Sequence, residues 1–250
     1  MLNTIIWNLL KVKNKLIKFE KANEQLPYRK YLFDELINRY TDEYFKGKRF
    51  LEIGPRDGID TFRLQGLNPS EIVIFDLPDK TEKNLQWLKN LKVNHKFIEE
   101  NFMYLEPHFF EKLGKFDLIY FTGVLYHNPE QLRFLQKLYE KLNFGGILVL
   151  ESATTRKRQL LNKNAVEILY PTTYRGTTTI THLPSSKAII SWLRMVGFQN
   201  IVNSNCYKYE NYNVINKRFA CIAEKQESDK QDVYYKKQIE DSPYIIGKSK

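Results

Sequence analysis

The sequence predicts an α/β fold built on a mostly parallel sheet, and three observations support this. A glycine-bracketed turn directly follows a β-rich run, further short apolar runs recur at regular intervals, and an amphipathic helix precedes the last of these runs. Near-continuous apolar runs suit strands that helices cover on both faces. The length of 250 residues and the 42% hydrophobic content fit one compact catalytic domain.

The glycine turn spans residues 50–58, FLEIGPRDG, and begins the alternating pattern. Gly54 and Gly58 have no Cβ, so the backbone between them can turn sharply and approach a ligand closely. Their spacing, G-x-x-x-G, differs from the dinucleotide fingerprint G-x-G-x-x-G, so a nicotinamide enzyme is not favoured. The turn therefore predicts a site for another nucleotide-like cofactor.

Polar side chains follow the next two expected strands. Residues 72–75 end at Asp76, about twenty residues after the turn, where an acid can accept hydrogen bonds from both ribose hydroxyls. Residues 96–98 precede Glu99, Glu100 and Asn101, and a polar side chain at this strand end can bind the adenine edge. Residues 116–121 and 146–151 are the fourth and fifth expected strands.

The helix before the fifth strand has clear start and stop signals. Asn128 can cap its start and Pro129 suits its first position. Gly145-Gly146 can end it. One apolar stripe, predicted to pack in the core, contains Leu132, Leu135, Leu138 and Leu142.

These segments resemble the ordered motifs of the class I S-adenosylmethionine-dependent methyltransferases. The resemblance covers roughly residues 30–224 and rests on LEIGPRDG, the acid of FDLPD, and FDLIYFTGVLYHNPEQLRFLQKLYEKLNFGGILVLES. It implies a Rossmann-like, seven-stranded, mostly parallel sheet with helices on both faces and an antiparallel last strand. The chain is most similar to the branch of tRNA wobble-uridine carboxymethyltransferases, through GVLYH and the P-S to W-L-x-x-x-G-F segment at residues 184–198.

The resemblance implies which residues bind S-adenosylmethionine. Glu52 supports the glycine loop, Asp76 holds the ribose and Asn101 lies near adenine. The full expected cofactor set is Glu52, Gly54, Pro55, Gly58, Asp76, Leu77, Asn101, Phe102, Phe121, Thr122 and Gly123.

Catalysis requires alignment more than activation, because the sulfonium methyl group is already electrophilic. His127 is the candidate base for an acceptor that must lose a proton; alternatively it only supports its loop. In the resembled branch, a tyrosine and an arginine matching Tyr126 and Arg218 hold the carboxylate of carboxy-S-adenosylmethionine. The alternatives are that Tyr126 packs and Arg218 forms an ion pair. The branch's N-terminal W-R-K-G-P-F stretch has no counterpart here.

The net charge of +10 predicts an anionic acceptor. Residues 1–30 and 151–210 each carry +5, whereas residues 31–150 carry −2. The insert at about residues 152–184 is expected to be a loop-rich acceptor cover, or else a helix and hairpin packed on the sheet edge. Arg56 either reaches an anionic acceptor or lies in solvent. The candidate acceptor residues are Arg56, Tyr170, Tyr174, Arg175, His182 and Arg218.

The domain is expected to span residues 31–224, between a basic amphipathic arm (residues 1–30) and a polar tail (residues 225–250). The arm is neither a secretory signal nor a membrane span, and is expected to pack on the domain or on a second subunit, or to contact a membrane peripherally. Cys206 and Cys221 form neither a disulfide framework nor a metal site. We therefore expect a cytoplasmic protein without a metal. We also expect the protein to form a homo-oligomer.

Three functions are compatible with these features. The first is methyl transfer to an O or N of a small polar, anionic acceptor, such as a sugar, a nucleotide sugar or a phosphorylated metabolite. The second is carboxymethyl or methyl transfer to tRNA with carboxy-S-adenosylmethionine. The third is a non-catalytic RNA-binding or scaffold protein that keeps the fold. Fold-level analogy does not identify the acceptor.

Overall fold

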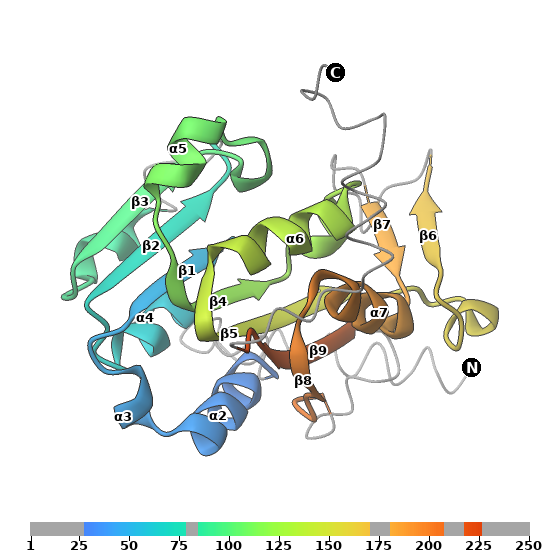
Figure 1. Ribbon diagram of the computed structural model, residues 1–250, viewed down its shortest axis with the longest axis horizontal. Coiled ribbons are helices and arrows are strands. Elements are labelled where there is room, and N and C mark those ends of the chain that lie inside the picture. Colours follow the sequence, from blue (N-terminus) through green and yellow to red (C-terminus); the bar gives the residue numbers. More distant parts are fainter. Residues whose placement is uncertain (1–27, 79–84, 171–180, 208–217, 227–250) are drawn as a thin grey trace, which may run out of the picture.

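The computed structural model describes residues 28–78, 85–170, 181–207 and 218–226, and these form an α/β fold around one seven-stranded sheet (Figure 1). The strand order is β3-β2-β1-β4-β5-β9-β8. Its strands are β1 (Arg49–Ile53), β2 (Glu71–Asp76), β3 (His95–Glu99), β4 (Phe116–Thr122), β5 (Leu142–Ala153), β8 (Gln199–Asn203) and β9 (Arg218–Glu224). The predicted fold class is confirmed.

The strand directions also match the expectation. β3, β2, β1, β4 and β5 are parallel to one another, and β9 pairs antiparallel with β5 on one side and β8 on the other. In the register, Ile53 of β1 lies opposite both Phe75 of β2 and Phe121 of β4. The carboxyl ends of these three strands therefore meet at one edge of the sheet.

Helices cover both faces of the sheet, and a separate core lies under each layer. The helices are α2 (Tyr28–Tyr40), α3 (Asp42–Phe45), α4 (Ile59–Gln65), α5 (Pro107–Lys112), α6 (Gln131–Lys141) and α7 (Ser186–Val196). Leu51 packs in the core beneath α5, α6 and α7, whereas its neighbour Phe50 packs beneath α2, α3 and α4 (Figure 1). Because alternate side chains point to opposite faces, both faces of β1 are buried.

The helix after β4 is present, with two corrections at its ends. It begins at Gln131, and the Asn128 side chain instead accepts a hydrogen bond from the Glu130 amide at 2.7 Å, just before the helix. Leu142 has extended backbone and pairs with Phe116, so it belongs to β5 rather than to the helix stripe. Gly145-Gly146 therefore lies within β5 and does not end the helix.

The insert after β5 is not a plain loop where the structure describes it. β6 (Val166–Leu169) and β7 (Thr181–Pro184) form a separate antiparallel pair beside the main sheet (Figure 1). Leu169 packs with Tyr126 and Leu183, whereas Ile168 is 64% exposed. The hairpin alternative thus describes this segment better than the loop-rich cover, because alternating side chains bury one face of β6.

Both expected domain boundaries fall on ordered structure. α2 begins at Tyr28, so the boundary at residue 30 lies inside a helix, and residues 1–27 of the predicted arm lie outside the described residues. Lys225, the first residue of the predicted tail, is buried, and its Nζ donates to the carbonyls of Tyr139 and Leu142 at 2.9 and 3.1 Å. Within the described ranges, no helix is long and apolar enough to cross a membrane. Cys206 and Cys221 are buried free thiols.

Candidate functional site

The candidate site lies at the sheet edge where β2, β1 and β4 end. The chain runs from β1 outward to β2 and β3 and then returns to β4 beside β1, which makes this edge a topological switch point, the usual ligand site of such sheets. The loops after β1 and β4 touch here. A Cβ at Gly54, whose φ is +74°, would lie only 2.4 Å from Cγ2 of Val124.

The second glycine of the turn is equally constrained. Gly58 has a φ of +75° at the start of α4, and a Cβ there would lie 2.3 Å from the ring of Trp87. Trp87 belongs to the short 3₁₀ turn η2 (Gln86–Asn90), on the path from β2 to β3. Both glycines are therefore required by close contacts as well as by their backbone conformation.

The polar residues predicted for the cofactor lie along this edge. Asp76 ends β2, and its Oδ1 accepts from the amide of the neighbouring, exposed Leu77 at 2.9 Å. Asn101 precedes the 3₁₀ turn η3 (Phe102–Tyr104), where its Oδ1 accepts from the Met103 amide at 3.1 Å. Thr122 and Gly123 lie at the end of β4. The edge thus brings these residues together, and their cofactor roles stay predictions.

The apolar residues of the predicted cofactor set are mostly core. Phe102 is 2% exposed and lies against Phe75, with ring centroids 5.2 Å apart. Phe121 and Pro55 are buried as well. The side chains of Phe102 and Phe121 fill the core, so their backbone is the part in a position to line a ligand.

Glu52 is sealed beneath the glycine turn. Its side chain accepts a hydrogen bond from Thr61 Oγ1 of α4 at 2.5 Å. Burial raises the pKa of Glu52 to about 8, so this carboxyl group is protonated at neutral pH. It therefore links β1 to the helix that follows the turn.

A buried ion pair lies where β5 and β9 meet. Arg218 donates through Nε to Oε1 of Glu151 and through a terminal nitrogen to Oε2, the latter at 2.7 Å. Tyr207 also donates to Glu151, at 2.5 Å. The Glu151 side chain is completely buried and that of Arg218 is 11% exposed. This is the ion-pair alternative for Arg218, and its charge is balanced inside the protein.

The two candidate catalytic residues lie beside this pair. Tyr126 and His127 belong to the 3₁₀ turn η4 (Leu125–His127), and their ring centroids are 4.0 Å apart. The Arg218 guanidinium carbon lies 5.5 Å from the centroid of the Tyr126 ring. Burial, reinforced by the charge of Arg218, lowers the pKa of His127 to about 4. The imidazole is therefore neutral at physiological pH.

The candidate acceptor residues are more scattered. Arg56 is exposed on the glycine turn, with a φ of +60°, and Tyr170 is 88% exposed after β6. His182 lies on β7, where its carbonyl accepts from Gln131 Nε2 at 2.7 Å. Tyr174 and Arg175 lie outside the described residues. Among the residues with described positions, no group of three or more His, Cys, Asp or Glu side chains could hold a metal ion.

Sequence reasoning missed the residues that complete these networks. Arg29 of α2 contacts the glycine turn, Glu151 pairs with Arg218, and Tyr207 donates to Glu151. Arg29 and Tyr207 give no local signal, because their partners are distant in the chain. Glu151 gives one: an acid at the end of an apolar strand is buried and needs a partner.

Glu52 should make folding pH-dependent in a specific direction. Its pKa is about 8 in the folded protein against 4.5 for an ordinary glutamate, so the stability it contributes is full below pH 4.5 and is lost as pH rises toward 8. We expect Glu52→Gln to remove this loss, seen as a flatter plot of unfolding free energy against pH from urea titrations. Glu43→Gln, which changes an exposed side chain of α3, is the control and should keep the wild-type slope. An unchanged slope in Glu52→Gln would show that Glu52 is ionised in the fold.

His127 should make the stability of the fold pH-dependent in the opposite direction. Its pKa falls from 6.5 to about 4 on folding, so the neutral form is favoured and stability decreases as pH falls from 6.5 toward 4. A proton NMR titration of the imidazole, assigned with His127→Asn, should give an inflection near pH 4. Removing the nearby positive charge in Arg218→Met should raise this pKa. An inflection at 6.5 in the wild type would contradict the burial of His127.

A family described as methyltransferase domains matches residues 25–203, well over half of the chain. Among curated proteins, the tRNA U34 carboxymethyltransferase of Nautilia profundicola is 27% identical over 186 residues, covering 74% of this chain and 55% of that protein. The protein of the same name from Colwellia psychrerythraea is 30% identical over 175 residues, covering 68% and 50% respectively. The chain thus spans about half the length of these relatives.

Solved structures share the fold at low identity. The N-terminal domain of EvdMO1, crystallised with SAH and D-fucose, matches with a TM-score of 0.60 and 17% identity over 78% of this chain and 83% of that one. The 1,6-didemethyltoxoflavin-N1-methyltransferase of Burkholderia thailandensis matches with a TM-score of 0.58 and 11% identity over 88% and 89%. Together with the family match and the strand order, these findings confirm the family and the fold identified from the motifs: the chain belongs to the methyltransferase-domain family and has the class I methyltransferase fold.

Proposed function

We propose that the chain transfers the methyl group of S-adenosylmethionine to an O or N of a small polar, anionic acceptor held near Tyr126 and His127. The observation that carries this proposal is the closed pair between Arg218 and Glu151. Because both charges are already balanced, Arg218 is already engaged and would have to leave Glu151 to hold the second carboxylate of carboxy-S-adenosylmethionine. The plain cofactor therefore suits this site better.

The residues at the strand ends fit that cofactor. The carboxylate of Asp76, at the end of β2, can accept hydrogen bonds from ribose hydroxyls. Asn101 uses Oδ1 to cap η3, which leaves Nδ2 as the group to donate to an adenine ring nitrogen. Gly54 and Gly58 let the backbone of the turn approach the methionine portion.

The protein's task in the reaction is to align the acceptor and remove a proton where necessary. The bound cofactor supplies an electrophilic methyl group, and S-adenosylhomocysteine remains after transfer. A neutral His127 has a ring nitrogen able to accept the acceptor's proton, although a pKa near 4 makes it a weak base before the acceptor binds. An anionic acceptor beside it would raise this pKa and strengthen the base.

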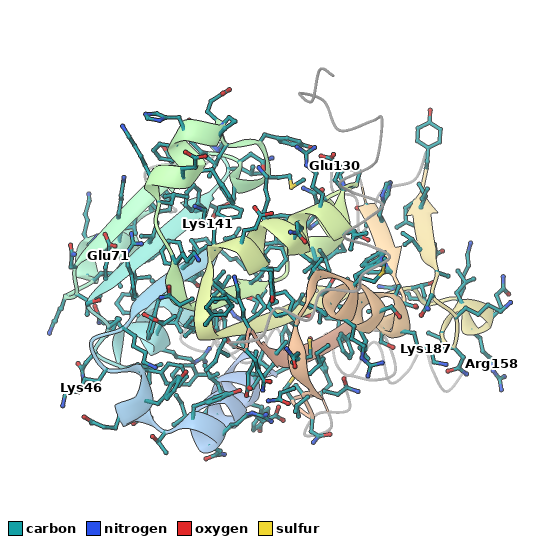
Figure 2. All side chains as sticks on the ribbon, viewed as in Figure 1. Lys46, Glu71, Glu130, Lys141, Arg158 and Lys187 are labelled. Carbon is teal, nitrogen blue, oxygen red and sulfur yellow. The ribbon has the colours of Figure 1, made fainter. Side chains whose placement is uncertain are left out.

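Support for an anionic acceptor comes from the basic segment after β5. Arg158 and Lys187 project from the end of the molecule that carries β6 and the start of α7 (Figure 2). Both side chains are exposed. The structural neighbours were crystallised with unlike small molecules, D-fucose and 1,6-didemethyltoxoflavin, so the fold alone does not choose among acceptors.

Asp76→Ala tests the cofactor site. We expect the affinity for S-adenosylmethionine, measured by calorimetry, to fall by about 10- to 100-fold, the usual effect of losing hydrogen bonds to a charged group. Asp34→Ala removes an exposed carboxylate on α2 and is the matched control, expected to bind as the wild type does. Wild-type affinity in Asp76→Ala would refute the ribose assignment. A wild-type protein that binds no cofactor would favour the non-catalytic RNA-binding or scaffold role.

A second candidate function is carboxymethyl or methyl transfer to tRNA. It is supported by the curated relatives, which are tRNA U34 carboxymethyltransferases, and by the 5.5 Å approach of Arg218 to Tyr126. In this function Arg218 would have to share its guanidinium between Glu151 and the cofactor's second carboxylate. The cytoplasmic location, the homo-oligomer and the peripheral membrane contact stay predictions under either function.

The cofactor preference separates the two functions. If the Arg218 pair is closed, the wild type should bind S-adenosylmethionine at least about tenfold more tightly than the carboxylated form, because an unpaired buried carboxylate is costly. The double variant Arg218→Met with Glu151→Gln removes both charges, so it avoids leaving Glu151 buried and unpaired. It should still bind S-adenosylmethionine more tightly than the carboxylated form. A wild-type preference for the carboxylated form that disappears in the double variant would instead establish the tRNA-type cofactor.

A further inference from the structure

We propose that the first turn of α2 is part of the cofactor site, and that Arg29 is a positioning residue that fixes the glycine turn. This inference rests on the proposed function, in which residues 54–58 approach S-adenosylmethionine. Arg29 does not need to contact the cofactor. It acts through Asp57, which lies inside the turn, and through Asp60, which lies in the first turn of α4.

The contacts are short and mostly buried. Arg29 Nη1 lies 2.9 Å from Oδ1 of Asp57, and Arg29 Nε lies 2.7 Å from Oδ2 of Asp60. The side chains of Arg29 and Asp60 are 9% and 1% exposed. Arg63 holds the other oxygen of Asp60 at 2.7 Å. The planar guanidinium of Arg29 thus connects the glycine turn, through Asp57, with α4, through Asp60.

The turn needs such an external support because its backbone is strained. Gly54, Arg56 and Gly58 all have positive φ, and Arg56 carries a Cβ that makes this conformation unfavourable. Asp57 lies between the last two of these residues. Its Oδ1, the oxygen that Arg29 contacts, also accepts from the Ile59 amide at 3.3 Å. Arg29 therefore orients the carboxylate that connects the turn to α4.

Tyr28, the residue before Arg29, packs this turn of α2 against the rest of the protein. Tyr28 is 4% exposed, and its ring centroid lies 4.8 Å from that of Tyr207. The guanidinium carbon of Arg218 lies 5.7 Å from the centroid of the Tyr28 ring. One turn of α2 therefore contacts the glycine turn through Arg29 and the Arg218 pair through Tyr28. The two sides of the site are thereby joined by a single rigid element.

Loss of the Arg29 charge would disturb this arrangement in a defined way. Asp57 would lose its ion-pair partner, and its negative charge would face that of Asp60 without the guanidinium between them. The repulsion would move Asp57 and with it the turn. The main effect is expected on cofactor affinity.

The test compares Arg29 of α2 with Arg49 of β1, since each forms an ion pair with a carboxylate. Arg29→Met should weaken binding of S-adenosylhomocysteine by at least about tenfold in calorimetry, and Arg29→Lys should restore part of it, because an ammonium group cannot reproduce the two-pronged contact. The control is Arg49→Met. Arg49 pairs with Glu71 at 2.6 Å, and Glu71 is the first residue of β2 (Figure 2), at the opposite end of the strands from the glycine turn. Thermal denaturation should show that Arg49→Met also loses stability, while its affinity stays within about twofold of the wild type.

A second variant makes the test independent of folding defects in Arg29→Met. Asp57 is 36% exposed, so Asp57→Asn should fold, and it should weaken binding to a similar extent. The double variant should be no weaker than Arg29→Met alone, because both changes break one link. Wild-type affinity in Asp57→Asn, or additive losses in the double variant, would overturn the role of Arg29 while leaving the cofactor site intact. A wild type that fails to bind S-adenosylhomocysteine would overturn the proposed function as well.

Discussion

The candidate site depends on the alignment of the carboxyl ends of β2, β1 and β4. Ile53 lies opposite Phe75 on one side and Phe121 on the other, so the glycine turn, Asp76 and Gly123 all begin within a residue or two of the same line. This register is strongly fixed, because both faces of these strands are buried and a shift by one residue would exchange the two cores. In this register the loops after β1 and β4 meet at Gly54 and Val124.

Buried charge is the second constraint on this edge, and the protein balances it in three different ways. Glu151 is paired with Arg218, and Asp60 is held between Arg29 and Arg63. Glu52 instead keeps its proton, because burial raises its pKa to about 8. His127 responds to the same environment by losing its proton, which leaves a neutral ring beside a fixed positive charge. The chemistry available at the site follows from these protonation states more than from the identities of the residues.

The site also depends on α2, a helix that comes before the methyltransferase motifs in the sequence. Tyr28 and Arg29 contact opposite sides of the site, although neither belongs to a motif that marks the family. The matched family region begins at residue 25, so it includes this turn. A domain boundary drawn after residue 30 would therefore remove residues that the site uses.

The sequence by itself determined the local features. Apolar runs identified β1 to β5, the motifs identified the antiparallel last strand and the family, and the spacing of leucines identified α6, because each of these signals is contained in a short stretch of chain. The tertiary structure decided whether a residue is buried, which element it belongs to and which partner it contacts. It placed Phe102 and Phe121 in the core, assigned Leu142 to β5, paired Arg218 with a glutamate 67 positions away, and set the pKa of His127. These outcomes depend on burial and on partners distant in sequence, and local patterns carry no information about either.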